Sequence, residues 1–130
     1  MGKIEASHRQ LIEEVDLCFV ATASNSGVPN VSPKGSIAVL DDDHLVFADI
    51  MSPCTRKNLQ ENPRLTVLVC KPERFQGYQF QGTAELSQEG DIYEMLVRRI
   101  KEKKVPVPPP VNAVKVKVEE IRTLGEKRDG

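Results

Sequence analysis

The residues best suited to chemistry lie in one short stretch of the sequence, MSPCTRKNLQENP (51–63). Ser52 and the proline after it predict the start of a helix, because a serine hydroxyl caps the first turn and proline needs no backbone N–H there. Thr55, Arg56 and Lys57 then fall in the first turn, although acidic residues are favoured at this positive end of the helix dipole. Free backbone N–H groups, a hydroxyl and two cations suit an anion, and phosphate is the natural occupant.

A purely structural interpretation of the same residues stays open. Arg56 and Lys57 could form a solvated basic pair balanced by Glu61, with no ligand. A further cation, Lys34, lies in SPKGS (32–36), where a proline and a glycine interrupt regular strand pairing and could expose backbone donors and acceptors. Lys34 is therefore a second candidate for contact with a bound molecule.

The cysteines and histidines form no recognisable metal-binding or catalytic motif. The three cysteines are widely spaced and include no C-x-x-C pair. Cys18 and Cys70 lie in apolar runs and are predicted to be buried, whereas Cys54 lies beside the basic helix start, where packing is favoured over reactivity. His8 and His44 are expected at the surface. We therefore expect no metal site and assign no catalytic residue.

Composition limits the class of protein. A chain of 130 residues with 39% hydrophobic and 28% charged residues suits a single domain over 1–130. Eighteen basic and nineteen acidic side chains give a net charge of −1, so no general attraction to nucleic acid or to an anionic membrane is expected. The sequence contains no apolar run long enough to span a bilayer and no hydrophobic signal segment. A cytoplasmic location is the default expectation.

Apolar periodicity predicts a small β-barrel with peripheral helices. Short antiparallel strands in this number usually close into a barrel, because closure removes exposed sheet edges. The segment VPVPPP (105–110) is predicted to be an extended connector of polyproline character, and most simply a spacer. The predicted strands are 16–24, 31–40, 45–49, 65–70, 78–86 and 113–124, and the predicted helices are 3–14, 53–61 and 92–104.

The order of these elements resembles the FMN-binding split-barrel family, which includes pyridoxamine 5'-phosphate oxidase and small FMN-binding proteins. The most specific feature is a basic residue, then Asn-Leu, then Asn-Pro before an apolar strand. This resemblance implies a mainly β fold, a six-stranded antiparallel split β-barrel with flanking helices. The matching segments are VATASNSGVPNVSPKG (20–35), LVFADIMSPCTRKNLQENPRLTVLV (45–69), YQFQGTAEL (78–86) and AVKVKVEEIRTL (113–124).

The resemblance also implies a homodimer with FMN at the subunit interface. A barrel this small cannot enclose a three-ring cofactor, so a groove shared by two copies is the roomier place. The phosphate would lie at the start of the 53–61 helix, and VSPKGS and FADI would border the ribityl chain and the ring. The predicted cofactor-binding residues are Ser32, Pro33, Lys34, Gly35, Ser36, Phe47, Ala48, Asp49, Ser52, Thr55, Arg56, Lys57 and Asn58, together with Gln79 and Gln81, which the partner subunit could supply.

The function that this resemblance implies is that of an FMN-dependent oxidoreductase acting on a small organic substrate or exchanging electrons with a donor. Flavin carries its own redox chemistry, so the protein needs to supply mainly binding, orientation and electrostatic tuning. The alternatives are a noncatalytic flavin-binding or redox-sensing module and a deazaflavin-dependent reductase. A haem protein or a binding protein for another phosphorylated metabolite are further alternatives.

Overall fold

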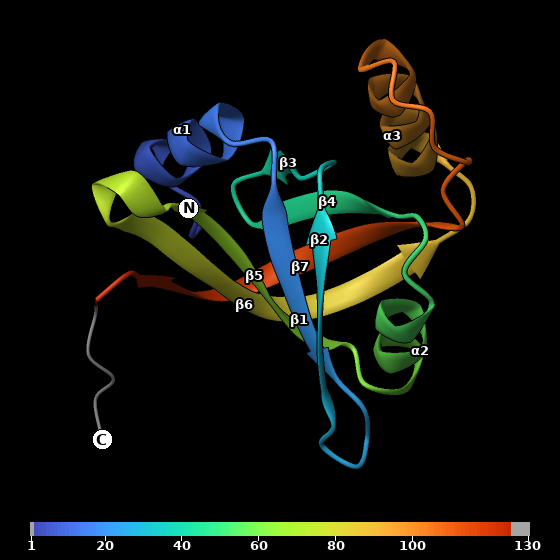
Figure 1. Cartoon of the computed structure of the whole chain (residues 1–130), viewed down its shortest axis with the longest axis horizontal. Helices are drawn as coiled ribbons and strands as arrows, with labels where there is room; N and C mark the ends of the chain where they lie inside the picture. The colour runs from blue at the N-terminus through green and yellow to red at the C-terminus, as the bar shows by residue number, and fades with distance from the viewer. Residues whose placement is uncertain (1, 126–130) are drawn as a thin grey trace.

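The computed structural model describes residues 2–125, and their strands form one seven-stranded antiparallel sheet (Figure 1). The strands are β1 (Cys18–Ala23), β2 (Pro29–Lys34), β3 (Ala38–Asp41), β4 (His44–Asp49), β5 (Arg64–Lys71), β6 (Gln76–Ser87) and β7 (Asn112–Thr123). Their order in the sheet is β2-β1-β5-β6-β7-β4-β3. The helices are α1 (Ala6–Glu14), α2 (Pro53–Glu61) and α3 (Asp91–Glu102), with a 3-10 turn, η1 (Pro72–Arg74), between β5 and β6.

This architecture confirms the mainly β split barrel with flanking helices, and it has seven strands rather than six. The segment predicted as one strand over 31–40 is divided into β2 and β3. β2 pairs with β1 at one edge of the sheet and β3 pairs with β4 at the other. The residues between them, 35–37, carry the chain from one edge to the other. One regular strand cannot do this, and Gly35 marks the break.

The other predicted elements are present with small shifts at their ends. α2 has the predicted bounds, 53–61. The predicted strand over 78–86 extends to Gln76–Ser87, because it pairs along its length with both β5 and β7. Helix α3 ends at Glu102 rather than at 104. Within residues 2–125, no helix has the length and apolar character that crossing a membrane requires.

The core lies inside the curved sheet and is built from alternate residues of its strands. Central members with no exposed surface include Val20, Phe47, Val67, Phe80 and Val116. A second, smaller cluster lies beneath α3, where Leu96 packs with residues of β3, β4 and β7. β4 is therefore covered on both faces, and this double covering carries Asp49, at its carboxyl end, into a buried position.

The helices cover different parts of the barrel (Figure 1). α1 adds Leu11 and Ile12 to the core, and α2 lies against β1 and β2. Both histidines are half-buried rather than fully at the surface. His8 packs edge-on against Tyr78, with ring centroids 4.6 Å apart, and His44 contacts Asp41.

Glycine should be required at position 82, where the backbones of the paired strands β6 and β7 approach closely. A Cβ atom at this position would lie 1.9 Å from the carbonyl oxygen of Lys117, beside a register shift between Gln81 and Gly82. We expect Gly82→Ala to lower the free energy of unfolding by at least about 2 kcal/mol, because backbone must move to accept the methyl group. Urea denaturation measures the effect. Thr83→Ala is the neighbouring control and should cost about 1 kcal/mol or less; equal losses would contradict the close approach.

Candidate functional site

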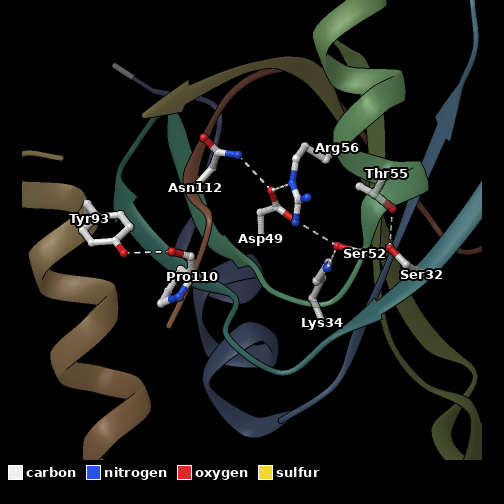
Figure 2. A network of polar contacts seen from close by, with 9 residues as sticks. All are labelled: Ser32, Lys34, Asp49, Ser52, Thr55, Arg56, Tyr93, Pro110 and Asn112. Carbon is white, nitrogen blue, oxygen red and sulfur yellow. Dashed lines mark hydrogen bonds and ion pairs between the residues drawn. The ribbon is translucent and has the colours of Figure 1, made fainter. Parts of the chain in front are cut away.

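A buried carboxylate, Asp49, lies at the centre of a network of polar contacts (Figure 2). Its Oδ2 atom accepts hydrogen bonds from Arg56 Nε at 2.6 Å and from Asn112 Nδ2 at 2.9 Å. Its Oδ1 atom accepts from Arg56 Nη2 and from the Ser52 hydroxyl, both at 3.2 Å. Asp49 therefore joins the end of β4 to the start of α2 and to the first residue of β7.

These contacts fix the charge states of the pair. Burial alone would raise the pKa of the Asp49 carboxyl, but hydrogen bonds from Arg56 and Asn112 outweigh it and hold that pKa below its usual value. The hydrogen bond between Arg56 and Asp49 also raises the pKa of the Arg56 guanidinium. Arg56 therefore pairs with Asp49 and not with Glu61, and its side chain is only 25% exposed. The interpretation of Arg56 as a solvated surface cation is wrong.

Lys34 extends this network from the end of β2. It is 5% exposed, and its ammonium donates a hydrogen bond to the Ser52 hydroxyl, which in turn donates to Asp49 (Figure 2). Burial lowers the pKa of Lys34, and the nearby Asp49 carboxylate opposes that shift. Ser52 makes no side-chain cap on α2. The predicted cap is therefore wrong, because the hydroxyl serves the network instead.

The first turn of α2 presents its side chains in different directions. Thr55 is buried against β2, where its hydroxyl lies 2.7 Å from the Ser32 hydroxyl and accepts a hydrogen bond from Asn30 Nδ2 at 3.1 Å. Lys57 is exposed, and no side-chain hydrogen bond or ion pair engages it within the described residues. The structure thus separates Thr55, Arg56 and Lys57, the three candidate phosphate ligands, and leaves Lys57 available to a ligand.

Asn58 belongs to the buried side of the same helix. Its Nδ2 atom donates a hydrogen bond to the Thr22 hydroxyl of β1 at 3.0 Å. Together with Thr55, this contact attaches α2 to both of the strands beneath it. Asn58 thus orients the helix whose amino end carries the candidate anion site.

A cavity of about 200 Å³ adjoins the network. Lys34 belongs to both, since its side chain lines the cavity and contacts Ser52. One wall consists of Pro33, Lys34, Gly35, Ser36 and Ala48, all predicted cofactor-binding residues. Ser36 also accepts a hydrogen bond from the Ala48 N–H at 2.9 Å, which fixes the 35–37 crossing against β4. The remaining lining residues are Ile50, Met51, Ile100, Lys103, Val105 and Val107.

Sequence reasoning placed Ile50 at the site, within FADI (47–50), but missed the rest of this second wall. Its only local signal was the alternation of valine and proline in VPVPPP, which we interpreted as a spacer. Asn30 and Asn112 were also missed, because an isolated asparagine in a turn or before a strand carries no distinguishing pattern. Their roles become apparent only when Thr55 and Asp49 are placed beside them.

Three predicted site residues belong neither to this cavity nor to the network and helix start beside it within one chain. The side chain of Phe47 is fully buried in the core. Gln79 and Gln81 lie on β6 and line two other cavities, the first beside Arg122 and the second beside Thr66. Their predicted contribution from a partner subunit stays a prediction.

Among the described residues, no cysteine makes a hydrogen bond in the network, although Cys18 is the cross-strand partner of Lys34. Cys18 is fully buried, as predicted, and burial raises the pKa of its thiol to about 12. Cys70 is half-buried rather than fully buried, and Cys54 is exposed. Within residues 2–125, no three His, Cys, Asp or Glu side chains gather as metal ligands would.

The comparisons with known proteins agree with this fold. Residues 4–125 match the family model described as pyridoxamine 5'-phosphate oxidase. The chain belongs to this family. An uncharacterised family relative from Methanocaldococcus jannaschii is 38% identical over 115 residues, covering 85% of this chain and 74% of the relative.

Solved structures share the family fold over nearly the whole chain. HupZ of Group A Streptococcus is similar with a TM-score of 0.84 and 29% identity, covering 98% of this chain and 99% of HupZ. An FMN-binding protein from Syntrophomonas wolfei has a TM-score of 0.77 at 21% identity, covering 92% of this chain and 85% of that protein. An F420 reductase (TM-score 0.70, 19% identity) and HutZ, the heme storage protein from Vibrio cholerae (0.71, 14%), share the fold alone.

Asp49→Asn should destabilise the protein by about 2 to 3 kcal/mol at neutral pH, because the substitution leaves the Arg56 guanidinium without its counter-charge. Urea denaturation measures the loss. Asp42→Asn is the matched control: its carboxylate pairs with Arg9 at the surface, where its side chain is 68% exposed, and should cost about 1 kcal/mol or less. Similar losses in both variants would contradict the central role of Asp49.

The Asp49 interaction should also appear in the pH dependence of stability. A carboxyl whose folded-state pKa is depressed stabilises the fold above the unfolded-state pKa, about 4 for aspartate, and this stabilisation is lost as the pH falls through the lower folded-state value. The melting temperature of the wild-type protein should therefore fall more steeply below about pH 4 than that of Asp49→Asn. Plots of melting temperature against pH that run parallel for the two proteins would contradict this assignment.

Proposed function

We propose that this chain is an FMN-binding flavoprotein and works, as a homodimer, as an oxidoreductase on a small organic substrate. The observation that carries the proposal is the direct contact between a mostly apolar cavity and a polar helix start, with Lys34 shared by both. FMN has the same two-part character, an apolar planar ring at one end and a phosphate at the other.

The start of α2 suits the phosphate. Its first-turn N–H groups have no side-chain cap, and Lys57 has no partner among the described side chains. A phosphate dianion gains charge-assisted hydrogen bonds from such groups. We assign Lys57 and Thr55 to the phosphate directly. Arg56 adds positive charge while bonded to Asp49, and Asn58 orients the helix.

The cavity suits the ring. Pro33, Gly35, Ser36 and Ala48 offer backbone and small side chains, so a flat group can approach the chain closely. When bound, FMN would supply hydride or single-electron transfer, and the protein would supply position and charge. The positive charge of Lys34 at this wall would raise the reduction potential of a flavin held there.

The outer face of the sheet suits a second copy of the chain. Phe19 pairs in register with Pro33 on one side and Leu68 on the other, and Leu68 pairs with Gln79. Residues directly opposite one another share a face, and this face exposes Phe19 to 36% and Val31 to 65%. This exposed face extends across the sheet from Gln79 on β6 to Pro33 on β2. A symmetric partner covering the face would therefore bring its own Gln79 and Gln81 toward the site.

The residues that line the cavity bear differently on the alternative cofactors. Haem would need an axial ligand, and neither histidine nor cysteine lines the cavity, which favours a flavin. A deazaflavin cofactor also carries phosphate and an apolar ring, so the site residues suit both. A noncatalytic flavin-binding module would bind FMN in the same way without turnover.

Titration of the purified protein with FMN tests the proposal. We expect saturable quenching of flavin fluorescence at one FMN per chain, and a dimer by light scattering. Haemin should bind more weakly in a parallel titration, and a parallel titration with F420 compares the deazaflavin with FMN. Anaerobic reduction of the bound flavin by NADH or NADPH separates an oxidoreductase from a binding module. No quenching at excess FMN would refute FMN binding.

Lys57→Ala and Thr55→Ala should each weaken FMN binding by roughly 1 to 3 kcal/mol, the range for a lost charge-assisted bond to phosphate. Riboflavin lacks the phosphate, so its affinity should not change. Lys117→Ala, at an exposed lysine on β7, is the control for general charge. Unchanged FMN affinity in both site variants would place the phosphate elsewhere.

A further inference from the structure

Residues 103–110, which follow α3 and which we call the strap, cross one side of the cavity. The strap is attached at both ends. Lys103 Nζ donates a hydrogen bond to the Gly35 carbonyl at 2.7 Å, and the Tyr93 hydroxyl donates to the Pro110 carbonyl at 2.8 Å (Figure 2). Directly after the strap, the Val111 N–H donates to the Asp49 carbonyl at 2.9 Å. The strap therefore begins at the 35–37 crossing and ends beside the backbone of Asp49.

The composition of the strap makes it stiff. Four of its eight residues are proline, at positions 106 and 108–110, and proline fixes its own backbone and restricts the residue before it. A segment with fixed ends and restricted backbone loses little conformational entropy when a ligand packs against it. The strap is thus a preformed wall rather than a flexible connector.

The face that the strap turns to the cavity is apolar. Val105 and Val107 alternate with prolines and line the cavity together with Ile100. Within residues 2–125, Lys103 and Lys34 are the only charged side chains in the lining, and both already hold hydrogen bonds. A ligand group in contact with the valines must therefore be apolar.

The size of the cavity limits which group this is. Its volume, about 200 Å³, is below the roughly 300 to 1,000 Å³ typical of sites that hold a whole ligand. One part of a cofactor fits, and the remainder must extend toward Ser52 and α2. Lys34, which shares the cavity lining with the strap, contacts Ser52 at the start of α2.

We propose that Val105 and Val107 of the strap form the ring-binding wall of the cofactor site and determine its specificity for a flat, apolar ring. This inference rests on the proposed function. It adds residues from a segment that the resemblance did not include, and it assigns them to the ring rather than to the phosphate.

Val107→Phe tests the wall by filling the cavity. We expect FMN and riboflavin to bind at least tenfold more weakly, and by the same factor, because the ring is common to both. Val111→Phe makes the same change at an exposed valine just outside the cavity and should bind both ligands as wild type does. Urea denaturation of both variants checks that the fold is kept.

Limited trypsin digestion of wild-type protein supplies a second readout that needs no variant. Cleavage after Lys103 and Lys104 should slow at least threefold in saturating riboflavin, because a ring bound against Val105 and Val107 disfavours the local opening that cleavage requires. Cleavage after Arg64, which is exposed on β5, should keep its rate.

The outcomes distinguish the two proposals. Normal flavin binding by Val107→Phe, or weaker binding of FMN with riboflavin unchanged, would overturn the ring-binding wall while leaving FMN binding intact. Flavin binding without protection of the strap would also overturn it. If wild type binds neither FMN nor riboflavin, the proposed function itself is refuted and the wall is refuted with it.

Discussion

The site depends on the burial of one charge. A carboxylate that is 2% exposed would be strongly disfavoured without partners, and Asp49 accepts four hydrogen bonds from Ser52, Arg56 and Asn112. These donors come from the start of α2 and the start of β7. To satisfy Asp49, the chain must hold the end of β4, the first turn of α2 and the end of the strap in one arrangement.

The same network accounts for the charge that the site presents. Three cations, Lys34, Arg56 and the exposed Lys57, accompany the single carboxylate of Asp49, so the helix start carries two positive charges in excess. The whole chain has a net charge of −1, and the excess is therefore local. Attraction to Asp49 offsets the repulsion between Lys34 and Arg56, and the remaining charge matches a phosphate dianion. A basic helix start is thus stable before any ligand binds.

Much of this site was predictable from local sequence, and its long-range contacts were not. Proline after Ser52 and Asn-Pro at 62–63 set the bounds of α2, because capping and chain termination act within a few residues. The partner of Arg56 lies on a strand, and Asn112 lies 63 residues from Asp49, so no periodicity connects them. The Ser52 cap failed for the same reason, since a tertiary hydrogen bond to Asp49 competes with the local one. The predicted strand over 31–40 is divided into β2 and β3 because the chain must pass from one edge of the sheet to the other. The alternation of apolar residues does not predict such a break.

The strap's place in the chain explains how a ring site can vary without loss of the fold. Its ends are fixed by Gly35 and Asp49, but between them its backbone belongs to no strand of the sheet. Substitutions at Val105 or Val107 would thus change the cavity while leaving the β4–β7 pairing, which begins at Asp49 and Asn112, intact. The phosphate end has no such freedom, because Thr55 and Asn58 also attach α2 to the sheet. Under the proposed assignment, anion binding is tied to stability, and selection of the ring is separable from it.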